Sequence, residues 1–157
     1  MFCVKESIQV NAPIERCFLL STSVPLVRKI LGMRPVEGKT TGLVTLGDRV
    51  LWRGWKFGLP VKHETLITGF DAPFFFQDSM ASGQFREFHH DHRFRETGGG
   101  TLFEDVVEFS LPFAAAGQVV GRMVVVPHVL GLLRRRFGML KRIAEGDEWK
   151  QFLSPTR

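Results

Sequence analysis

The stretch FREFHHDHRFRETGGGTLFEDVVEFSL, residues 85–111, decides the fold. Polar and apolar residues alternate on both sides of the glycine-rich TGGG, so the stretch predicts two antiparallel strands joined by a tight hairpin. If the central glycines form the turn, His92 lies opposite Asp105. A register shifted by one residue would bury two glutamates of the second strand without partners, which is costly. The pattern therefore predicts which side chains of the hairpin share a face.

The two faces of this hairpin differ in chemistry. The outer face is charged and polar and is expected to contact solvent: it carries Glu87, His89, Asp91, Arg93 and Arg95. The inner face is mostly aromatic and aliphatic: it carries Phe88, His90, His92, Phe94, Phe103, Asp105 and Val107. The neighbouring histidines are thus divided, and His90 and His92 are expected inside the protein together with Asp105.

Three further alternating segments precede the hairpin between residues 48 and 80, and a less regular strand is expected within 33–44. Short linkers containing Gly, Pro and Asp separate these segments, which predicts an antiparallel meander. A turn centred on FGLP would pair Trp52 with Thr65 and place His63 on the same face. Trp52, His63 and Thr65 therefore join the inner face.

The two ends of the chain predict helices. A strand at the N-terminus is followed by two short amphipathic helices in PIERCFLLST and VPLVRKILG, within residues 13–32. From 114 to 145, apolar residues recur alternately four and three positions apart, which predicts one buried face of a long helix. This face includes Val119, Met123, Val126, Leu130, Leu133, Phe137, Leu140 and Ala144. Pro127 is expected to kink the helix or to divide it.

Length and composition narrow the class of protein. The 157 residues, 44% of them hydrophobic, fit a single domain over residues 1–157. Fifteen Phe and no Tyr fit either a core built around an apolar ligand or a plain Phe-packed core. Cys3 and Cys17 form no zinc motif and fit a reducing compartment. Because the N-terminus also lacks the features of a secretion signal, a cytoplasmic location is expected.

The net charge of +5 comes entirely from residues after position 110. A basic end to the chain fits either peripheral contact with an anionic membrane or the solvated face of one helix. The three arginines at 134–136 would spread around a helix, so no nucleic-acid-binding surface is expected. The apolar run 111–133 carries Arg122 in its middle, so a membrane span is not expected either.

The order of elements resembles the START-like or helix-grip superfamily (SRPBCC), which includes polyketide cyclases, lipid-transfer domains and plant pathogenesis-related allergens. The local similarity lies in QVNAPIERCF (9–18), LGDRVLWR (46–53), FQDSM (76–80), FHHDHRF (88–94) and GGTLFEDVVEF (99–109). The resemblance implies an α+β fold: a curved antiparallel sheet of six or seven strands around a long C-terminal helix, with two short helices after the first strand. It identifies no reaction, because the superfamily contains binders and enzymes alike. No catalytic residue is carried over, because the sequence holds no residue-level motif of a characterised cyclase.

A cavity between sheet and helix is the expected site, and a small hydrophobic molecule such as a lipid, isoprenoid or polyketide is the expected ligand. The residues expected to line it are Trp52, His63, Thr65, Phe88, His90, His92, Phe94, Phe103, Asp105 and Val107. No cofactor and no metal ion is expected, and the sequence predicts no particular oligomeric state. An interaction module with a collapsed cavity and a basic helix is a third class of function.

The polar groups of the inner face leave three alternatives open. Asp105 and the histidines either satisfy one another in a solid core, or orient the polar end of an apolar ligand, or perform catalysis. In the catalytic alternative Asp105 holds His92 as a general base of a cyclase or dehydratase. A two-His-one-carboxylate metal site of His90, His92 and Asp105 is a variant of it, weakened by the roughly 6.6 Å between alternate residues of a strand.

Overall fold

One curved layer of seven antiparallel strands forms the body of the protein. The computed structural model describes residues 1–153. Its elements are β1 (Phe2–Val10), α1 (Ile14–Thr22), α2 (Val24–Leu31), β2 (Arg34–Gly38), β3 (Arg49–Lys56), β4 (Leu59–Asp71), β5 (Phe75–Ser82), β6 (Glu87–Thr97), β7 (Gly100–Ser110), α3 (Ala114–Val120), the π-helical η1 (Gly121–Val125), α4 (Val126–Glu145) and α5 (Trp149–Leu153). The strand order is β1-β7-β6-β5-β4-β3-β2.

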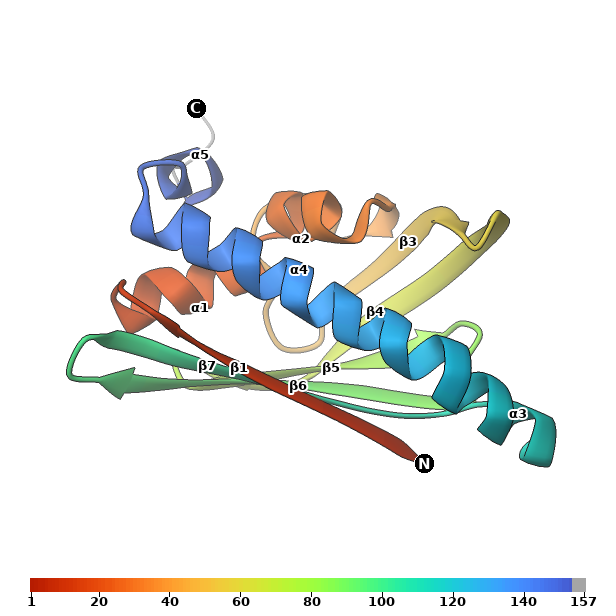
Figure 1. Ribbon diagram of the computed structural model, residues 1–157. Helices are drawn as coiled ribbons and strands as arrows, with labels where there is room; N and C mark the ends of the chain where they lie inside the picture. The colour runs from red at the N-terminus through yellow and green to blue at the C-terminus, as the bar shows by residue number, and fades with distance from the viewer. Residues whose placement is uncertain (154–157) are drawn as a thin grey trace.

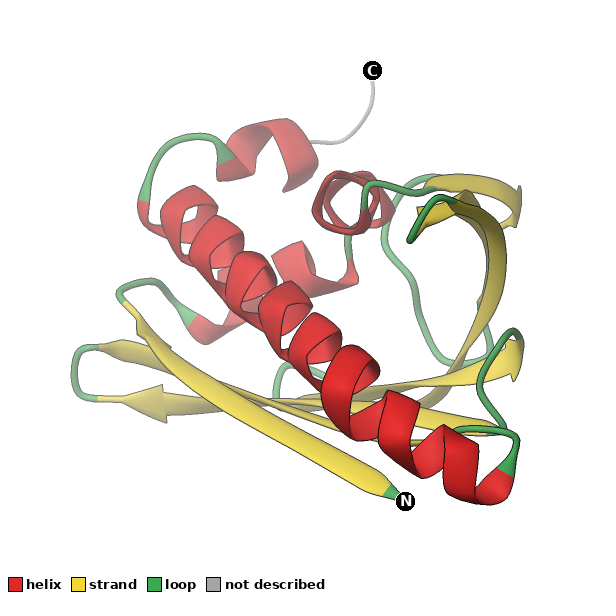
Figure 2. Ribbon diagram, turned by 45° about the vertical axis from the view of Figure 1, so that its right-hand side comes forward, coloured by secondary structure: helices red, strands yellow, loops and turns green. Residues whose placement is uncertain are grey.

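The predicted α+β architecture is confirmed. The long helical segment of α3, η1 and α4 lies across one side of the sheet (Figure 1), and the edge of the sheet that holds β2 and β3 curls toward it (Figure 2). The two short helices follow the first strand. Pro25 lies in the first turn of α2, and Gly32 ends the helix with a left-handed φ of 63°, donating its N–H to the carbonyl of Arg28.

The register of the β6–β7 hairpin agrees with the prediction. His92 lies opposite Asp105, and Phe94 lies opposite Phe103. Burial alternates along β7 as a strand covered on one face requires: Phe103, Asp105 and Val107 are buried while the residues between them are more exposed. The inner and outer faces deduced from the glycine turn are therefore those of the folded protein.

The predicted register of the β3–β4 hairpin is wrong by two residues. Trp52 pairs with His63 and not with Thr65. The turn consists of two residues, Phe57 and Gly58, whose φ values of 52° and 74° are both positive. Such a two-residue turn matches the twist of the flanking strands, although Phe rarely adopts this conformation. Because the shift is two residues and not one, the side chains keep the faces that were predicted.

The long helix is not divided at Pro127. The π-helical η1 ends directly before α4, and the N–H of Val126 bonds to the carbonyl of Gly121, five residues back. A π-helical turn holds more residues than an α-helical turn, so it rotates the apolar stripe about the helix axis. Val119 and Met123 are consequently 59% and 75% exposed. The predicted buried face is wrong for these two residues.

Beyond η1 the predicted stripe holds. The buried face of α4 includes Leu133, Phe137, Leu140 and Ala144. The helical segment Ala115–Glu145 has the length and hydropathy of a membrane span, but α4 packs on β1, α1 and α2. Burial of each large apolar side chain contributes roughly 1.5–3 kcal/mol to folding. The C-terminal half of the helix is therefore part of the protein core.

Candidate functional site

A cavity of about 540 Å³ lies between the concave face of the sheet and helices α2 and α4. Most of its wall is apolar and comes from elements far apart in sequence. Representative lining residues are Val27 and Leu31 on α2, Trp52 on β3, Ile67 on β4 and Leu133 on α4. The volume falls within the range of small-molecule sites, roughly 300–1,000 Å³. The structure thus contains the cavity that was predicted from the sequence.

The structure places most of the predicted site residues at this cavity. The seven that line it are Trp52, His63, Thr65, Phe88, His90, His92 and Val107. Phe94 and Phe103 belong instead to a solid core cluster, so their prediction as cavity-lining residues is wrong. The reason is Phe18 of α1, whose ring centroid lies 5.5 Å from that of Phe94. The ring of Phe18 occupies the space over this end of the sheet. Asp105 does not line the cavity either, because it lies buried behind His92.

His92 is the centre of a buried polar cluster. Its Nδ1 lies 2.9 Å from Oδ1 of Asp105, as expected from the hairpin register, and its Nε2 lies 2.8 Å from Oδ2 of Asp78. The ring also stacks on Phe76 at a centroid distance of 4.1 Å. Both nitrogens therefore face carboxylate oxygens, which requires both of them to carry a proton. The cluster favours His92 as an imidazolium ion.

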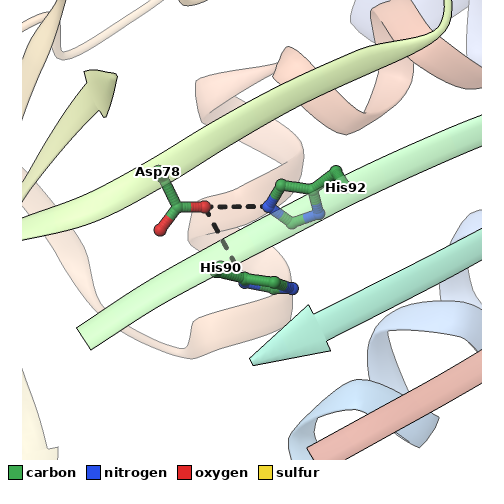
Figure 3. A group of neighbouring side chains, drawn as sticks. All are labelled: Asp78, His90 and His92. Atoms are coloured by element: carbon green, nitrogen blue, oxygen red, sulfur yellow. Dashed lines mark hydrogen bonds and ion pairs between the residues drawn. The ribbon is translucent and has the colours of Figure 1, made fainter. Parts of the chain in front are cut away.

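Asp78 was not predicted from the sequence. It lies on β5 directly opposite His90 of β6, and its carboxylate points at the two histidines (Figure 3). Its position two residues after the buried Phe76 was the available signal, because alternate strand residues share a face. The pairing of β5 with β6 ends at Ser79 and His89, several residues before the loop at 83–86, so turn chemistry could not fix this register.

Arg136 of α4 is the second residue that the sequence reading missed. Its Nε donates to Oδ2 of Asp105 at 3.0 Å, and only 9% of its side chain is exposed. One amino group of Arg136 also lies 3.2 Å from Nδ1 of His92. When Nδ1 donates its proton to Asp105, both groups of this contact are donors, so the contact is not a hydrogen bond. The spacing of three from Leu133 and four from Leu140 places Arg136 on the buried helix face. The arginine run thus contains one inward-facing member.

His90 lies beside His92, with ring centroids 3.8 Å apart. Its Nδ1 is 3.7 Å from Oδ2 of Asp78, which is too far for a hydrogen bond. Its Nε2 is 3.3 Å from Oδ2 of Asp105, yet within the described part of the chain this buried nitrogen makes no hydrogen bond of acceptable geometry. His90 is therefore the least satisfied polar side chain of the cluster.

The charges of the cluster shift the pKa values in opposite directions. Burial alone lowers the pKa of His92, but Asp105 and Asp78 outweigh burial and raise it. Burial, followed by the adjacent His92, lowers the pKa of His90. Burial raises the pKa of Asp105, but His92 and Arg136 reverse this and hold it well below its usual range. Both carboxylates are therefore ionised at neutral pH, and His90 is neutral.

His63 completes the polar part of the wall from β4. Its ring meets Phe88 edge-on at a centroid distance of 5.7 Å. Burial lowers its pKa, and the negative charge of Asp78 offsets part of this effect. His63 and His90 thus offer neutral imidazole groups on one side of an otherwise apolar cavity. That arrangement suits a ligand with one polar end.

Comparison with known proteins identifies the fold. No protein-family model matches the chain, and no curated protein matches its sequence. TTHA0849 from Thermus thermophilus is similar over 88% of this chain and 96% of its own, with 17% identity and a TM-score of 0.68. The ginseng major latex-like protein 151 from Panax ginseng is similar over 92% and 98%, with 12% identity and a TM-score of 0.69. Ara h 8.0201 is similar over 88% and 97%, with 14% identity and a TM-score of 0.64.

The fold is the helix-grip fold. All three solved structures match nearly their whole length, and the seven-stranded sheet, the short helices after β1 and the long C-terminal helix are its features. Identities of 12 to 17% extend this likeness to architecture alone. The function of this helix-grip protein has to be argued from its cavity.

Proposed function

We propose that this protein binds a small hydrophobic molecule, such as a lipid, isoprenoid or polyketide, in the cavity between sheet and helix. The observation that carries the proposal is the cavity of about 540 Å³, whose wall is apolar except for one cluster of histidines and carboxylates. Burial of apolar ligand surface supplies the affinity at roughly 25 cal/mol per Å². The polar cluster supplies orientation, because a ligand atom that cannot hydrogen-bond there leaves buried groups unpaired.

The mouth of the cavity lies between the β3–β4 turn and the start of the long helix. Phe57 and Phe113 both line the cavity and are 67% and 83% exposed. The ring of Phe57 approaches that of His128 on α4 at 4.9 Å. A hydrophobic ligand entering here would contact mostly apolar surface, and movement of the two-residue turn would widen the opening.

Peripheral contact with an anionic membrane extends the same proposal to ligand transfer. Large apolar side chains are exposed on the elements next to the mouth, with Trp55, Leu59 and Met123 exposed by 70%, 64% and 75%. Basic residues on the same elements are Arg53, Lys56, Lys62 and Arg122. Exposed apolar side chains flanked by cations suit a membrane surface. Arg136, by contrast, is turned inward. We propose a cytoplasmic location, in which the protein faces such a membrane.

A second candidate function is enolisation or dehydration of a polyketide-like substrate. The sequence suggested His92 as the base, but both of its nitrogens are engaged by carboxylates. His90 lines the cavity and has a lowered pKa caused first by burial, so it is the imidazole available to accept a proton. In this reading the carboxylates of Asp105 and Asp78 stabilise the positive charge that forms on His90, against the like charge of His92.

The two functions are separated by one experiment. Binding of a naphthalene-sulfonate fluorophore and of its hydrophobic competitors measures the cavity directly, and turnover of any competitor measures catalysis. His90→Gln retains the size of the side chain and removes the base. It is expected to leave binding within about threefold under the first function and to abolish turnover under the second.

A further inference from the structure

Three side chains at the cavity wall present their donor atoms to one point. Asp78 on β5 and His90 and His92 on β6 each offer an atom, and these atoms all lie within 4.8 Å of one another. Figure 3 shows the carboxylate of Asp78 facing both imidazoles from the neighbouring strand. His90 and His92 are two residues apart and share a face, so the pleat of a single strand brings both rings to the same carboxylate.

The distances suit a small cation. Zn²⁺ binds imidazole nitrogen and carboxylate oxygen at about 2.0–2.2 Å, with its ligands in a tetrahedral arrangement. Neighbouring ligand atoms around such an ion are therefore separated by roughly 3.3 Å. Oδ2 of Asp78 lies 2.8 Å from Nε2 of His92 and 3.7 Å from Nδ1 of His90, which brackets that separation. Rotation of the side chains within their present rotamers would admit the ion.

A single carboxylate stands behind both imidazoles. Oδ1 of Asp105 lies 2.9 Å from Nδ1 of His92, and Oδ2 lies 3.3 Å from Nε2 of His90. These are the nitrogens that face away from Asp78. Histidines that bind a metal ion generally donate their other N–H to such a carboxylate, which fixes the tautomer and the ring orientation. Arg136 holds Asp105 in place from α4 at 3.0 Å.

This arrangement also explains the poorly satisfied His90. Without a cation its Nε2 is a buried nitrogen that lacks a hydrogen bond among the described residues, although a carboxylate oxygen lies 3.3 Å away. A cation on Nδ1 would place the ring proton on Nε2 and draw it toward Asp105. The same cation would relieve His92 of the proton that it shares with Asp78, because a coordinated nitrogen carries none.

We propose that Asp78, His90 and His92 bind a divalent first-row transition metal ion, Zn²⁺ or Fe²⁺, through Oδ2, Nδ1 and Nε2. Two imidazoles and one carboxylate are a donor set for these ions. The carboxylate is Asp78 and not Asp105, which the sequence suggested; Asp105 orients the ligands. All three residues line the cavity, so the remaining coordination positions face it.

The charges indicate what completes the coordination. Two carboxylates, one guanidinium and a divalent cation leave one positive charge in a largely apolar surrounding. A single anionic oxygen neutralises it, so hydroxide or the carboxylate or enolate end of a hydrophobic ligand is the chemical class that fits. This places the polar end of a cavity ligand at the metal ion. The ion itself binds whether or not such a ligand is present.

The test uses the untagged full chain freed of metal by a chelator. Titration with Zn²⁺ in a calorimeter, and with Co²⁺ followed by its visible absorption, is expected to show one equivalent bound. Asp78→Asn and His90→Gln remove ligands and should weaken Zn²⁺ binding more than a hundredfold. Asp105→Asn should weaken it about 10- to 100-fold. Affinity should also fall on acidification, because a proton competes for His92.

His89→Gln is the matched control, since His89 lies on the same strand, is exposed, and bonds to Ser79 on the other face. It should bind Zn²⁺ as tightly as the wild type. Circular dichroism melting establishes that each variant is folded before titration, and if one of the single variants unfolds, the titration of the other one decides. Absence of Zn²⁺ binding at 1:1 stoichiometry, or equal binding by the wild type and the His90→Gln protein, overturns the proposal.

Discussion

Arg136 on α4 and Asp105 on β7 form a buried ion pair, with Nε 3.0 Å from Oδ2, that joins the long helix to the sheet next to its β1 edge. Only 9% and 3% of the two side chains are exposed. The pair also bears on the site, because Asp105 holds His92 and His92 contacts Asp78. The polar residues of the cavity wall are therefore held in place by contacts from both the sheet and the long helix.

Arg136→Ala should destabilise the protein strongly. Removal of one partner leaves the Asp105 carboxylate buried without its cation, which costs about 3–5 kcal/mol of unfolding free energy. Arg135→Ala is the control, because Arg135 is the exposed neighbour in the same helix, and its effect should stay within about 0.5 kcal/mol. Urea unfolding followed by tryptophan fluorescence measures both. Equal effects of the two substitutions would contradict the buried pair.

The contribution of His92 to stability should depend on pH. Burial lowers its pKa, but Asp105 and Asp78 raise it above the ordinary value of 6.5. A raised pKa means that the folded state binds the proton more tightly than the unfolded chain. The resulting stabilisation is fully present below pH 6.5 and is lost as the pH rises through the raised pKa. The difference in unfolding free energy between the wild type and His92→Gln should shrink from pH 6 to pH 9.

Urea unfolding at pH 6, 7.5 and 9 measures this difference. The chelator is kept in every sample, so that metal binding does not contribute. His89→Gln again serves as the control, and its difference from the wild type should be nearly constant over this range. A His92 difference that grows with pH would show that the neutral imidazole is the stabilised form.

Truncation of Phe94 and truncation of Phe88, which lie toward opposite ends of the inner face of β6, should have different effects. Phe94 packs against Phe18 and Phe103 in the solid core, whereas Phe88 lines the cavity. Phe94→Ala should cost about 3–5 kcal/mol because it opens a void in a close-packed cluster. Phe88→Ala should cost less and change the affinity for a hydrophobic fluorophore instead. Chemical unfolding and fluorescence titration of both variants test this division.

The rim of the mouth should bind anionic vesicles. Replacement of both Trp55 and Phe113 by Ser removes two exposed apolar side chains and should reduce co-sedimentation with phosphatidylserine vesicles several-fold. Phe74→Ser is the control: Phe74 is 52% exposed but lies beyond the far end of β4 from the β3–β4 turn. Binding that is unaffected by the double substitution, or reduced equally by Phe74→Ser, would place any membrane contact elsewhere.

The sequence predicted those parts of the structure that depend on local rules. The glycine turn after β6 fixed the His92–Asp105 pairing, and helical spacing identified Leu133 and Phe137 as buried. The β3–β4 register was wrong because Phe57 occupies a left-handed turn position that favours glycine. The buried face predicted for the first turns of the helix was wrong because η1 shifts the apolar stripe. Both errors come from unusual backbone conformations that residue patterns do not signal.

Asp78 and Arg136 required the assembled fold. Asp78 reaches the site because β5 pairs with β6 in a register that their connecting loop does not set. Arg136 reaches it because α4, which packs on β1, directs this side chain to Asp105 of the neighbouring β7. A buried charge also contradicts the usual reading of an arginine run as solvated surface. The negative charge of Asp105 compensates the buried charge of Arg136. This contact between α4 and β7 is visible only in the folded structure.

Native mass spectrometry of the protein purified gently from cells tests the central claim most directly. The wild type should carry an extra mass that organic solvent releases as an apolar molecule. Val129→Trp fills the cavity from a lining, buried position and should abolish the extra mass, whereas Val119→Trp, at an exposed position of the same helical segment, should retain it. A wild type that shows only the bare chain mass, and that binds the hydrophobic fluorophore no better than Val129→Trp does, would contradict the account.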